Sequence, residues 1–544
     1  MGDVRTLERD TPTPARTPKV PHEDAFQLEL DAEQAATDRE YERRWWTLGV
    51  LCISLVMIVM ANSSLNVALP TLARDLHAES SSLQWIVDAY SLVFAGLLLT
   101  AGSLGDRYGR RLALNGGLIV FGLASAYAVM STTAEGVIAA RAVMGLGAAF
   151  VMPATLSILA HVFPPDERPR AIAIWAGFAG LGVAMGGVIS GALLEHFWWG
   201  SIFLINVFVV IAALIVGFIL IPASREHLHA PLDPFGALLS IAGLSALVYG
   251  IIEAPDHGWG STQTLLTFAA AIVILGGFIA WEFHTKEPML DLRFFRNPRF
   301  TAATTTITLV FFAMFGTYFI IAQYMQFVRG YSPLSTGVRM LPWAIAYMVS
   351  TTQSAKLVER FGQRRVVSIG LLVAGASLAL MSLSTTTSPY WFFAIALMIQ
   401  AAGMGVTTAP STGAIMRALP LHKAGVGSAV NDTTRELGGA LGVAVLGSLV
   451  ASGFRSSLGN VAHLGAQPNS LADALRDAAS LGGRSGSALA DAAREAYVNA
   501  FGTTLLVGMV VVVIASGLVY WLLRPSATEP VDAVVDTDMP VPAT

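Results

Sequence analysis

Long apolar segments of about 20 residues recur along nearly the whole chain, separated by short polar turns. A helix of about 20 apolar residues is long enough to cross the hydrocarbon core of a bilayer. The repeated pattern therefore predicts an all-α polytopic membrane protein rather than a string of soluble domains. We expect fourteen spans, with approximate limits 47–70, 83–103, 112–130, 135–162, 170–195, 199–221, 235–253, 263–283, 300–327, 333–355, 366–384, 389–417, 424–452 and 498–523.

Composition agrees with this pattern. Of the 544 residues, 54% are apolar and only 13% are charged, whereas soluble proteins carry about 25% charged residues. The net charge of −4 does not distinguish between classes of function, because the placement of the charges matters more than their sum. The single cysteine, Cys52, lies in the first apolar segment, which excludes a disulfide framework.

Basic residues gather in one set of short turns. With both chain ends inside, the outer turns hold only Arg74 and Arg329, and Arg339 lies just inside the tenth span. Lysine and arginine favour the cytoplasmic side of short loops, so this distribution predicts an even number of spans and two cytoplasmic termini. The basic residues expected at the cytoplasmic face are Arg43, Arg44, Arg107, Arg110, Arg111, Arg168, Arg170, Arg225, Lys286, Arg293, Arg296, Arg299, Lys356, Arg360, Arg364, Arg365, Arg417, Lys423 and Arg524.

The turn between the second and third spans reads GSLGDRYGRR, from Gly102 to Arg111. Its charged side chains cannot lie in hydrocarbon, so the turn marks a membrane face, and its arginines place that face in the cytoplasm. Its glycines allow two helix ends to approach closely and turn sharply. Asp106 is placed to meet a helix N-terminus or one of the arginines.

The pattern of this turn returns 253 positions later, in AKLVERFGQRR from Ala355 to Arg365. Gly109 and Arg111 correspond to Gly362 and Arg364, and glycines of the following helix repeat at the same offset. A fixed offset over some 20 residues predicts two related six-helix halves.

Six and six spans leave two spans between the halves. We therefore expect a first half at 45–225, a two-helix insertion at 226–290 and a second half at 291–524. The second half contains a long outer loop at 451–499, whose Ala, Asp and Arg content predicts one or two short surface helices.

The two ends of the chain are polar. Residues 1–44 lack the apolar core and cleavage site of a secretory signal, and we expect them to form a disordered cytoplasmic tail. Residues 525–544 are rich in proline and acidic side chains, and we expect a second disordered cytoplasmic tail there.

The turn pattern G-x-L-x-D-R-x-G-R-R resembles the loop signature of the major facilitator superfamily. Two six-helix halves with an inserted pair resemble its fourteen-span drug:proton antiporter family, which includes quaternary-ammonium and multidrug efflux pumps. The resemblance covers roughly 45–525 and is carried, besides the turn, by NVALPTL (66–72), WIVDAYSLVFAG (85–96), RAVMGLGAAFVMP (141–153), LLEHFWWGSIFLIN (193–206) and NDTTRELGGALGVAVLGS (431–448).

This resemblance implies a major facilitator fold whose two halves rock about a central cavity. It also implies that a proton gradient drives export of lipophilic, cationic drugs across the plasma membrane. The expected partners are a small lipophilic or cationic substrate, protons and the bilayer, with no nucleic acid, and the chain is expected to act as a monomer. The turn would then serve as a gating loop through Gly102, Asp106, Arg107, Gly109, Arg110 and Arg111.

Such a carrier needs an ionisable group near the middle of the membrane. Asp432 and Glu436 are four residues apart in the thirteenth span and share one helix face. Counted from Ala424 at 1.5 Å per residue, Glu436 lies about 18 Å deep. Desolvation and mutual repulsion would help one of these two acids to hold a proton. The alternative is a structural ion pair with Arg435 or with another helix.

Asp88 in the second span and Arg141 in the fourth are the other intramembrane candidates. The resemblance implies that Asp88 binds a proton or a cationic substrate and that Arg141 takes part in proton transfer. The alternatives are a helix-end acid near the headgroups and an arginine that braces two helices. Polar and aromatic residues that could line a pocket are Asn62, Asn66, Tyr90, Gln323, Gln326, Trp343, Tyr347 and Gln400.

The chain departs from the family pattern at several positions. Met144 replaces a glutamine beside Arg141, and Gly187 and Ser190 replace a proline and a glycine of the antiporter signature. Ala61 and Tyr347 occupy positions where some relatives carry an acid. The remaining acids suit a cationic substrate exchanged for protons, and they also permit a neutral substrate.

Other kinds of chemistry have no motif here. There is no G-x-x-x-x-G-K-[ST] pattern, so ATP is not the expected energy source. No histidine or cysteine cluster has metal-binding spacing, and we expect no cofactor and no enzymatic activity. Two alternatives to drug export stay open: export of an endogenous metabolite or lipid, and a transport-inactive receptor or scaffold with the same fold.

Overall fold

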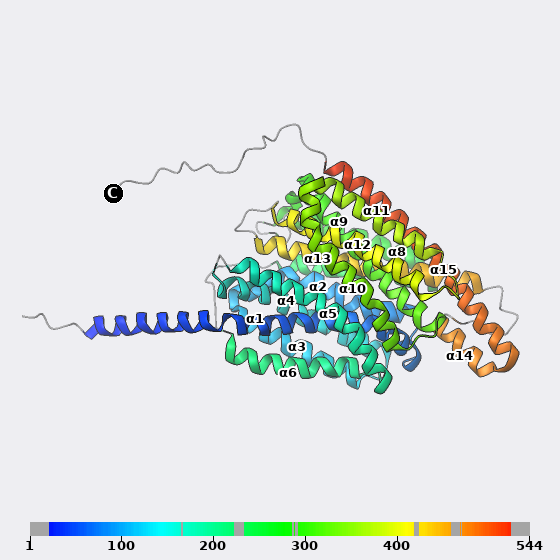
Figure 1. Ribbon diagram of the computed structural model, residues 1–544, viewed down its shortest axis with the longest axis horizontal. Helices are drawn as coiled ribbons and strands as arrows, with labels where there is room; N and C mark the ends of the chain where they lie inside the picture. Colours follow the sequence, from blue (N-terminus) through cyan, green and yellow to red (C-terminus); the bar gives the residue numbers. More distant parts are fainter. Residues whose placement is uncertain are drawn as a thin grey trace, which may run out of the picture.

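The computed structural model describes residues 21–164, 167–221, 233–285, 288, 292–417, 424–458, 468 and 470–523. These residues form long helices that run side by side, and they include no strand (Figure 1). The helices of the first half are α1 (Pro21–Asp75), α2 (Ser80–Tyr108), α3 (Arg110–Met130), α4 (Ala134–Val162), α5 (Arg168–His196) and α6 (Ser201–Leu220).

The insertion and the second half follow. The insertion contains α7 (Pro234–His257) and α8 (Thr262–His284). The second half contains the 3-10 helix η1 (Leu292–Arg296), α9 (Pro298–Gln323), the π-helical turn η2 (Tyr324–Val328), α10 (Pro333–Phe361), α11 (Gln363–Ser382), α12 (Tyr390–Arg417), α13 (Ala424–Leu458), α14 (Leu471–Leu481) and α15 (Gly483–Leu522).

Twelve of the described helices are long and apolar enough to cross a membrane. Helices α5 and α10 are not among them: α5 contributes only the shorter apolar stretch Leu181–His196, and α10 carries polar residues along its length. The all-α membrane fold is confirmed, and the count of fourteen spans stays a prediction.

The two halves repeat each other in three dimensions. In the first half, Arg111 of α3 donates to the Phe218 carbonyl of α6 at 2.6 Å, and its guanidinium lies over the Phe218 ring. In the second half, Arg364 of α11 donates to the Tyr520 carbonyl of α15 at 2.8 Å and lies over the Tyr520 ring. The repeated turn motif therefore anchors the third helix of each half to the sixth.

Glycine repeats give both halves the same close helix contact. A Cβ atom built on Gly117 of α3 would lie 2.7 Å from the Gly147 carbonyl oxygen of α4. At the matching place, a Cβ on Gly370 of α11 would lie 2.8 Å from the Gly403 carbonyl oxygen of α12. Each pair of helices thus packs backbone against backbone, which any larger side chain would prevent.

The halves meet along two seams, one between α2 and α13 and one between α5 and α10. We call the end of the bundle that carries α14 the α14 end; α14 contacts α1 there. In the α5–α10 seam, a Cβ on Gly337 would collide with the Gly187 carbonyl. Nearby, Gln326 of η2 donates to the Val67 carbonyl of α1 at 2.7 Å. These contacts hold the halves together at the α14 end.

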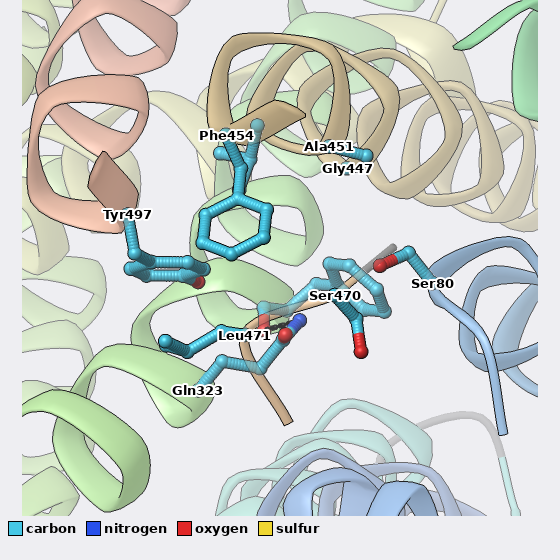
Figure 2. A pocket seen from close by; sticks show the side chains of 10 residues that line it. Ser80, Gln323, Gly447, Ala451, Phe454, Ser470, Leu471 and Tyr497 are labelled. Atoms are coloured by element: carbon cyan, nitrogen blue, oxygen red, sulfur yellow. Dashed lines mark hydrogen bonds between the residues drawn. The ribbon is translucent and has the colours of Figure 1, made fainter. Parts of the chain in front are cut away.

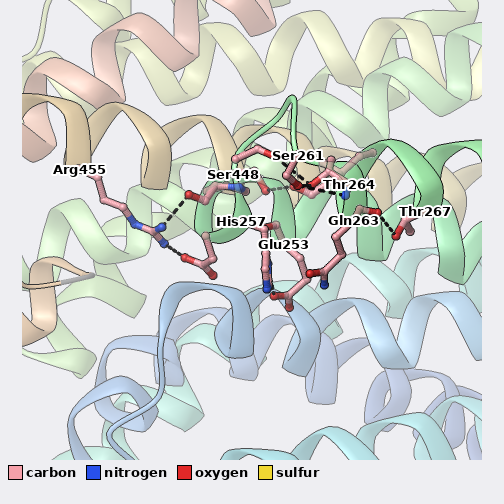
Figure 3. Close-up of polar contacts among 12 residues, drawn as sticks. Glu253, His257, Ser261, Gln263, Thr264, Thr267, Ser448 and Arg455 are labelled. Carbon is pink, nitrogen blue, oxygen red and sulfur yellow. Dashed lines mark hydrogen bonds and ion pairs between the residues drawn. The ribbon is translucent and has the colours of Figure 1, made fainter.

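Helix α7 covers the other seam, because it packs against both α2 and α13 (Figure 3). The Ser448 hydroxyl of α13 lies 3.1 Å from Gln84 Oε1 of α2 and 2.9 Å from the Ile251 carbonyl oxygen of α7. Arg455 of α13 pairs with Asp256 and donates to the Pro255 carbonyl at the end of α7. The insertion is therefore fastened to the second half by polar contacts at the α14 end.

The region predicted as a long outer loop is largely helical where it is described. Helix α13 continues to Leu458, α14 is a short helix as expected, and α15 begins at Gly483, well before the predicted span limit of 498. Figure 2 shows side chains from α2, α9, α13, α14 and α15 around a small pocket at this end, among them Ser80, Gln323, Gly447, Phe454, Leu471 and Tyr497.

The chain ends differ from the predicted tails in one respect. Helix α1 begins at Pro21, inside the segment 1–44 that was predicted as a tail. Residues 1–20 and the C-terminal segment 525–544 lie outside the described residues, so their predicted disorder stays a prediction.

We predict that Gly337→Leu lowers the free energy of unfolding in detergent by about 1–3 kcal/mol, because the added side chain overpacks the α5–α10 seam. Thermal unfolding of the purified protein measures this. Gly276→Leu in α8 is the matched control, since a Cβ there meets no atom within 4 Å. Equal stability of the two variants would show that α5 and α10 can move apart to accept the larger side chain without loss of stability.

Candidate functional site

Arg141 of α4 is the most deeply buried cation of the described chain segments, with an exposed fraction of 0%. Its Nε donates to the Ile86 carbonyl oxygen of α2 at 3.0 Å, and its Nη2 donates to Asn62 Oδ1 of α1 at 2.7 Å. Its guanidinium carbon lies 4.3 Å from the centre of the Tyr90 ring. A carbonyl, an amide and an aromatic face therefore compensate the buried charge.

Glu436 of α13 approaches this cluster from the second half. Its carboxyl group interacts electrostatically with Arg141 and Tyr90, and Ser91 of α2 lies beside it. Arg141 and Glu436 form no ion pair with each other, although the structure describes both side chains. The site thus combines α2 and α4 of the first half with α13 of the second.

Asp432 has a different environment from Glu436, one helical turn away. Its Oδ1 lies 3.8 Å from Arg435 Nη1 and accepts a hydrogen bond from Asn431 Nδ2 at 3.2 Å. Arg435 also lies over the Phe311 ring of α9. The structural ion pair considered for these acids therefore applies to Asp432, and Glu436 is the member that faces the first half.

Asp88 stands apart from the other predicted site residues. Its exposed fraction is 0%, and neither carboxyl oxygen has a hydrogen-bond partner within the described part of the chain. Ile86 and Tyr90, which contact Arg141, are four residues apart on one face of α2, and Asp88 between them points to another face. The structure brings Arg141 and Glu436 near each other, leaves Asp432 with Arg435 on α13, and leaves Asp88 separate.

The predicted gating loop is shorter than expected: Gly102–Tyr108 form the end of α2, Arg110 and Arg111 begin α3, and only Gly109 makes the turn. Gly109 has a φ angle of 115°, a conformation that glycine adopts without strain, and Gly362 repeats it in the second half with φ 79°. Arg107 lies over the Tyr108 ring, and Arg110 is buried. The side chain of Asp106 lies outside the described residues, so its predicted role is untested.

The structure shows how three residues that depart from the expected sequence pattern are packed. Met144 is fully buried, and Gly187 makes the close contact with Gly337. Tyr347 stacks on Trp343 with ring centres 5.2 Å apart and planes at 7°. Tyr347 is therefore one member of an aromatic pair.

Some site residues escaped sequence reasoning. Tyr90 and Asn62 were expected only as pocket lining, and Ser91 and the Ile86 carbonyl were not expected at all. These residues belong to the site because of the register of α2 against α4 and α13. That register cannot be deduced from a single sequence. No group of three or more metal-binding side chains occurs in the described segments.

Comparison with known proteins identifies the family. The family model described as Major Facilitator Superfamily matches residues 51–443. The chain belongs to the major facilitator superfamily. Multidrug efflux pump LfrA of Mycolicibacterium smegmatis is 34% identical over 89% of this chain and 97% of its own length.

Two further relatives have related names. The tetracenomycin C resistance and export protein of Streptomyces glaucescens is 31% identical, over 92% of this chain and 95% of its own. The methyl viologen resistance protein SmvA of Salmonella typhimurium is 35% identical, over 89% and 99%.

Solved structures share the fold at low sequence identity. A bacterial homolog of the human lysosomal transporter Spinster, in an inward-facing and unoccupied conformation, has a TM-score of 0.64. It is 18% identical and covers 88% of this chain and 97% of its own. The peptide transporter POT in complex with sulfate has a TM-score of 0.60 at 14% identity, over 88% of this chain and 96% of its own. These matches confirm the fold predicted from the turn motif and the internal repeat.

We predict that Asn62→Leu lowers the free energy of unfolding by about 1–3 kcal/mol, because Arg141 loses a buried hydrogen-bond partner. Thermal unfolding in detergent measures the change. When Arg141 is replaced by Met, Asn62 has no buried cation to bind. Asn62→Leu should then lower the free energy of unfolding by less. An equal loss in both backgrounds would mean that Asn62 acts through packing alone.

Proposed function

We propose that this protein is a proton-coupled exporter of lipophilic, cationic drugs. One observation carries the proposal: Glu436 of the second half faces Ser91, Tyr90 and Arg141 of the first half across the α2–α13 seam. An acid in that place changes its charge on binding a proton, and this alters the attraction between the halves. The printed names of the relatives, efflux pumps and resistance proteins, support the drug substrate.

The site suggests how a proton could be coupled to rocking of the halves. A charged Glu436 is attracted to Arg141 and can accept a hydrogen bond from the neighbouring Ser91, and both interactions favour a closed seam. Protonation removes the charge and weakens both interactions, so the seam opens more easily. A cationic substrate competes with the proton for the same carboxylate, which links export to proton entry.

Asp88 has a separate part in this proposal. A charged carboxylate buried without a partner costs several kcal/mol, so Asp88 holds a proton in the closed arrangement. It would release that proton only when the seam opens to water. Asp432 has its charge compensated by Arg435 on the same helix.

The proposal includes the setting of the protein. The chain acts as a monomer in the plasma membrane with both termini in the cytoplasm. Its energy source is the proton gradient, and it uses no nucleotide or other cofactor and catalyses no reaction. Its partners are the small substrate, protons and lipid, with no nucleic acid.

A second candidate is export of an uncharged aromatic compound, an endogenous metabolite or lipid included. The stacked pair Trp343 and Tyr347 favours it, because this pair offers a flat apolar surface. Tyr318 adds a third ring, at 6.0 Å from Trp343. Proton exchange at Glu436 would drive either kind of substrate.

We predict that inverted membrane vesicles with an acidic interior take up ethidium, and that Glu436→Gln reduces the initial rate by about tenfold or more, the equivalent of about 1.4 kcal/mol. Asp88→Asn reduces the rate as well, because the second proton site is lost. Asp432→Asn has a smaller effect, since Glu436 remains. Fluorescence of the dye measures uptake.

The control is Glu135→Gln, an exposed acid in the first turn of α4. It should transport like the unmodified protein. Absence of gradient-dependent uptake by the unmodified protein, with normal amounts in the membrane, would remove the cationic-drug proposal. A panel of neutral aromatic compounds would then test the second candidate.

The gating loop yields a further prediction. Asp106→Ala and Arg110→Ala should each slow transport by about tenfold, the cost of one charge-assisted hydrogen bond, without preventing membrane insertion. Uptake rates divided by the amount of protein in the membrane measure this. Unchanged rates in both variants would show that the loop has no part in cycling.

A further inference from the structure

Two opposite charges lie near each other in this site without pairing. Arg141 and Glu436 interact electrostatically, yet no ion pair joins them although both side chains are described. In the low dielectric of a protein interior, a direct arginine–carboxylate contact is strongly attractive. Such a contact would hold the α2–α13 seam closed and keep Glu436 charged. In this structure the guanidinium is instead engaged by groups of the first half.

Helix α2 supplies two of those groups. The Ile86 carbonyl oxygen and the Tyr90 ring are four residues apart, so they form a two-point clamp on one face of the helix. Asn62 adds a third contact from α1. Together they hold Nε, Nη2 and one face of the guanidinium, while Nη1 has no partner among the described residues.

Tyr90 is the member of the clamp that interacts with both charges. Its ring is fully buried beneath the Arg141 guanidinium, and its phenol interacts electrostatically with Glu436 as well. Its hydroxyl makes no hydrogen bond to any described residue. The ring, rather than the hydroxyl, is thus the part that contacts Arg141.

We propose that Tyr90 is a positioning residue whose ring keeps Arg141 from pairing with Glu436. This inference rests on the proposed function in taking Glu436 as the proton site. With the ring in place, the carboxylate of Glu436 is attracted electrostatically by Arg141 but forms no ion pair with it. The proton can then bind and leave as the seam opens and closes.

Other charged groups around Glu436 do not replace this role. Asp432 and Arg435 lie on the same helix and pair with each other, and Ser91 contributes a neutral hydroxyl. Arg141 is the cation that approaches Glu436 from the first half. Removing the Tyr90 ring therefore uncovers one face of the guanidinium, and its Nη1, which bonds to no described residue, becomes the new partner for Glu436.

The test compares Tyr90→Leu with Tyr90→Phe in the full-length purified protein. Infrared difference spectra follow the protonated carboxyl band, which Glu436→Gln assigns. In Tyr90→Leu, Arg141 pairs with Glu436 and stabilises its charged form. The pH at which the band is half-maximal should then fall by about one to three units, the usual effect of an adjacent opposite charge. Tyr90→Phe keeps the ring and should titrate like the unmodified protein.

One further variant makes the outcome decisive. In Tyr90→Leu combined with Arg141→Met, the acid shift should disappear because no guanidinium remains. A Tyr90→Phe variant that shifts like Tyr90→Leu would overturn the proposal and assign the role to the hydroxyl. No shift in Tyr90→Leu, with the Glu436 band present, would also overturn it.

The spectra do not depend on transport. An acid shift without ethidium uptake by the unmodified protein would uphold the positioning role and reject the cationic-drug function. Uptake that requires Glu436, without an acid shift in Tyr90→Leu, would uphold the function and reject the positioning role.

Discussion

The burial of the Arg141 guanidinium is the constraint on which the centre of this molecule depends. A charge that has left water must be compensated by fixed partners. Those partners come from α1 and α2, so three helices of the first half must keep one register. Glu436 then meets an already assembled cluster from across the seam. Small displacements of α13 therefore change the electrostatic environment of an acid without disturbing the helices that hold the arginine.

Close contacts between glycines hold the helices of the first half together, and equivalent contacts occur in the second half. The close pairs Gly117 with Gly147 and Gly370 with Gly403 let two helices pack through their backbones. The arginines of the repeated turn then anchor the third helix of each half to the sixth. Because lipid offers no hydrophobic drive for helices to associate, such tight contacts and buried polar bonds are what keeps each half together.

The two seams between the halves are built differently. The α5–α10 seam closes through the backbone contact of Gly187 with Gly337. The α2–α13 seam instead contains the polar side chains Gln84, Ser448 and Glu436. Helix α7 lies over the second seam and adds an apolar cluster beside it, with Leu92 of α2 and Ala440 of α13. One helix of the inserted pair, α7, thus covers the seam that carries the charges.

The sequence by itself determined the helices, the repeat, the turn motif and the family, because each depends on short-range pattern: the length of apolar runs, a fixed offset and local glycines. It also pointed to Arg141, Asp432 and Glu436, since charges are rare in apolar segments. Only the tertiary structure decided that Asp432 pairs with Arg435, that Glu436 faces Arg141, and that Asp88 stands apart. Those differences depend on how far each helix is rotated about its axis, and rotation is set by packing between helices far apart in the chain.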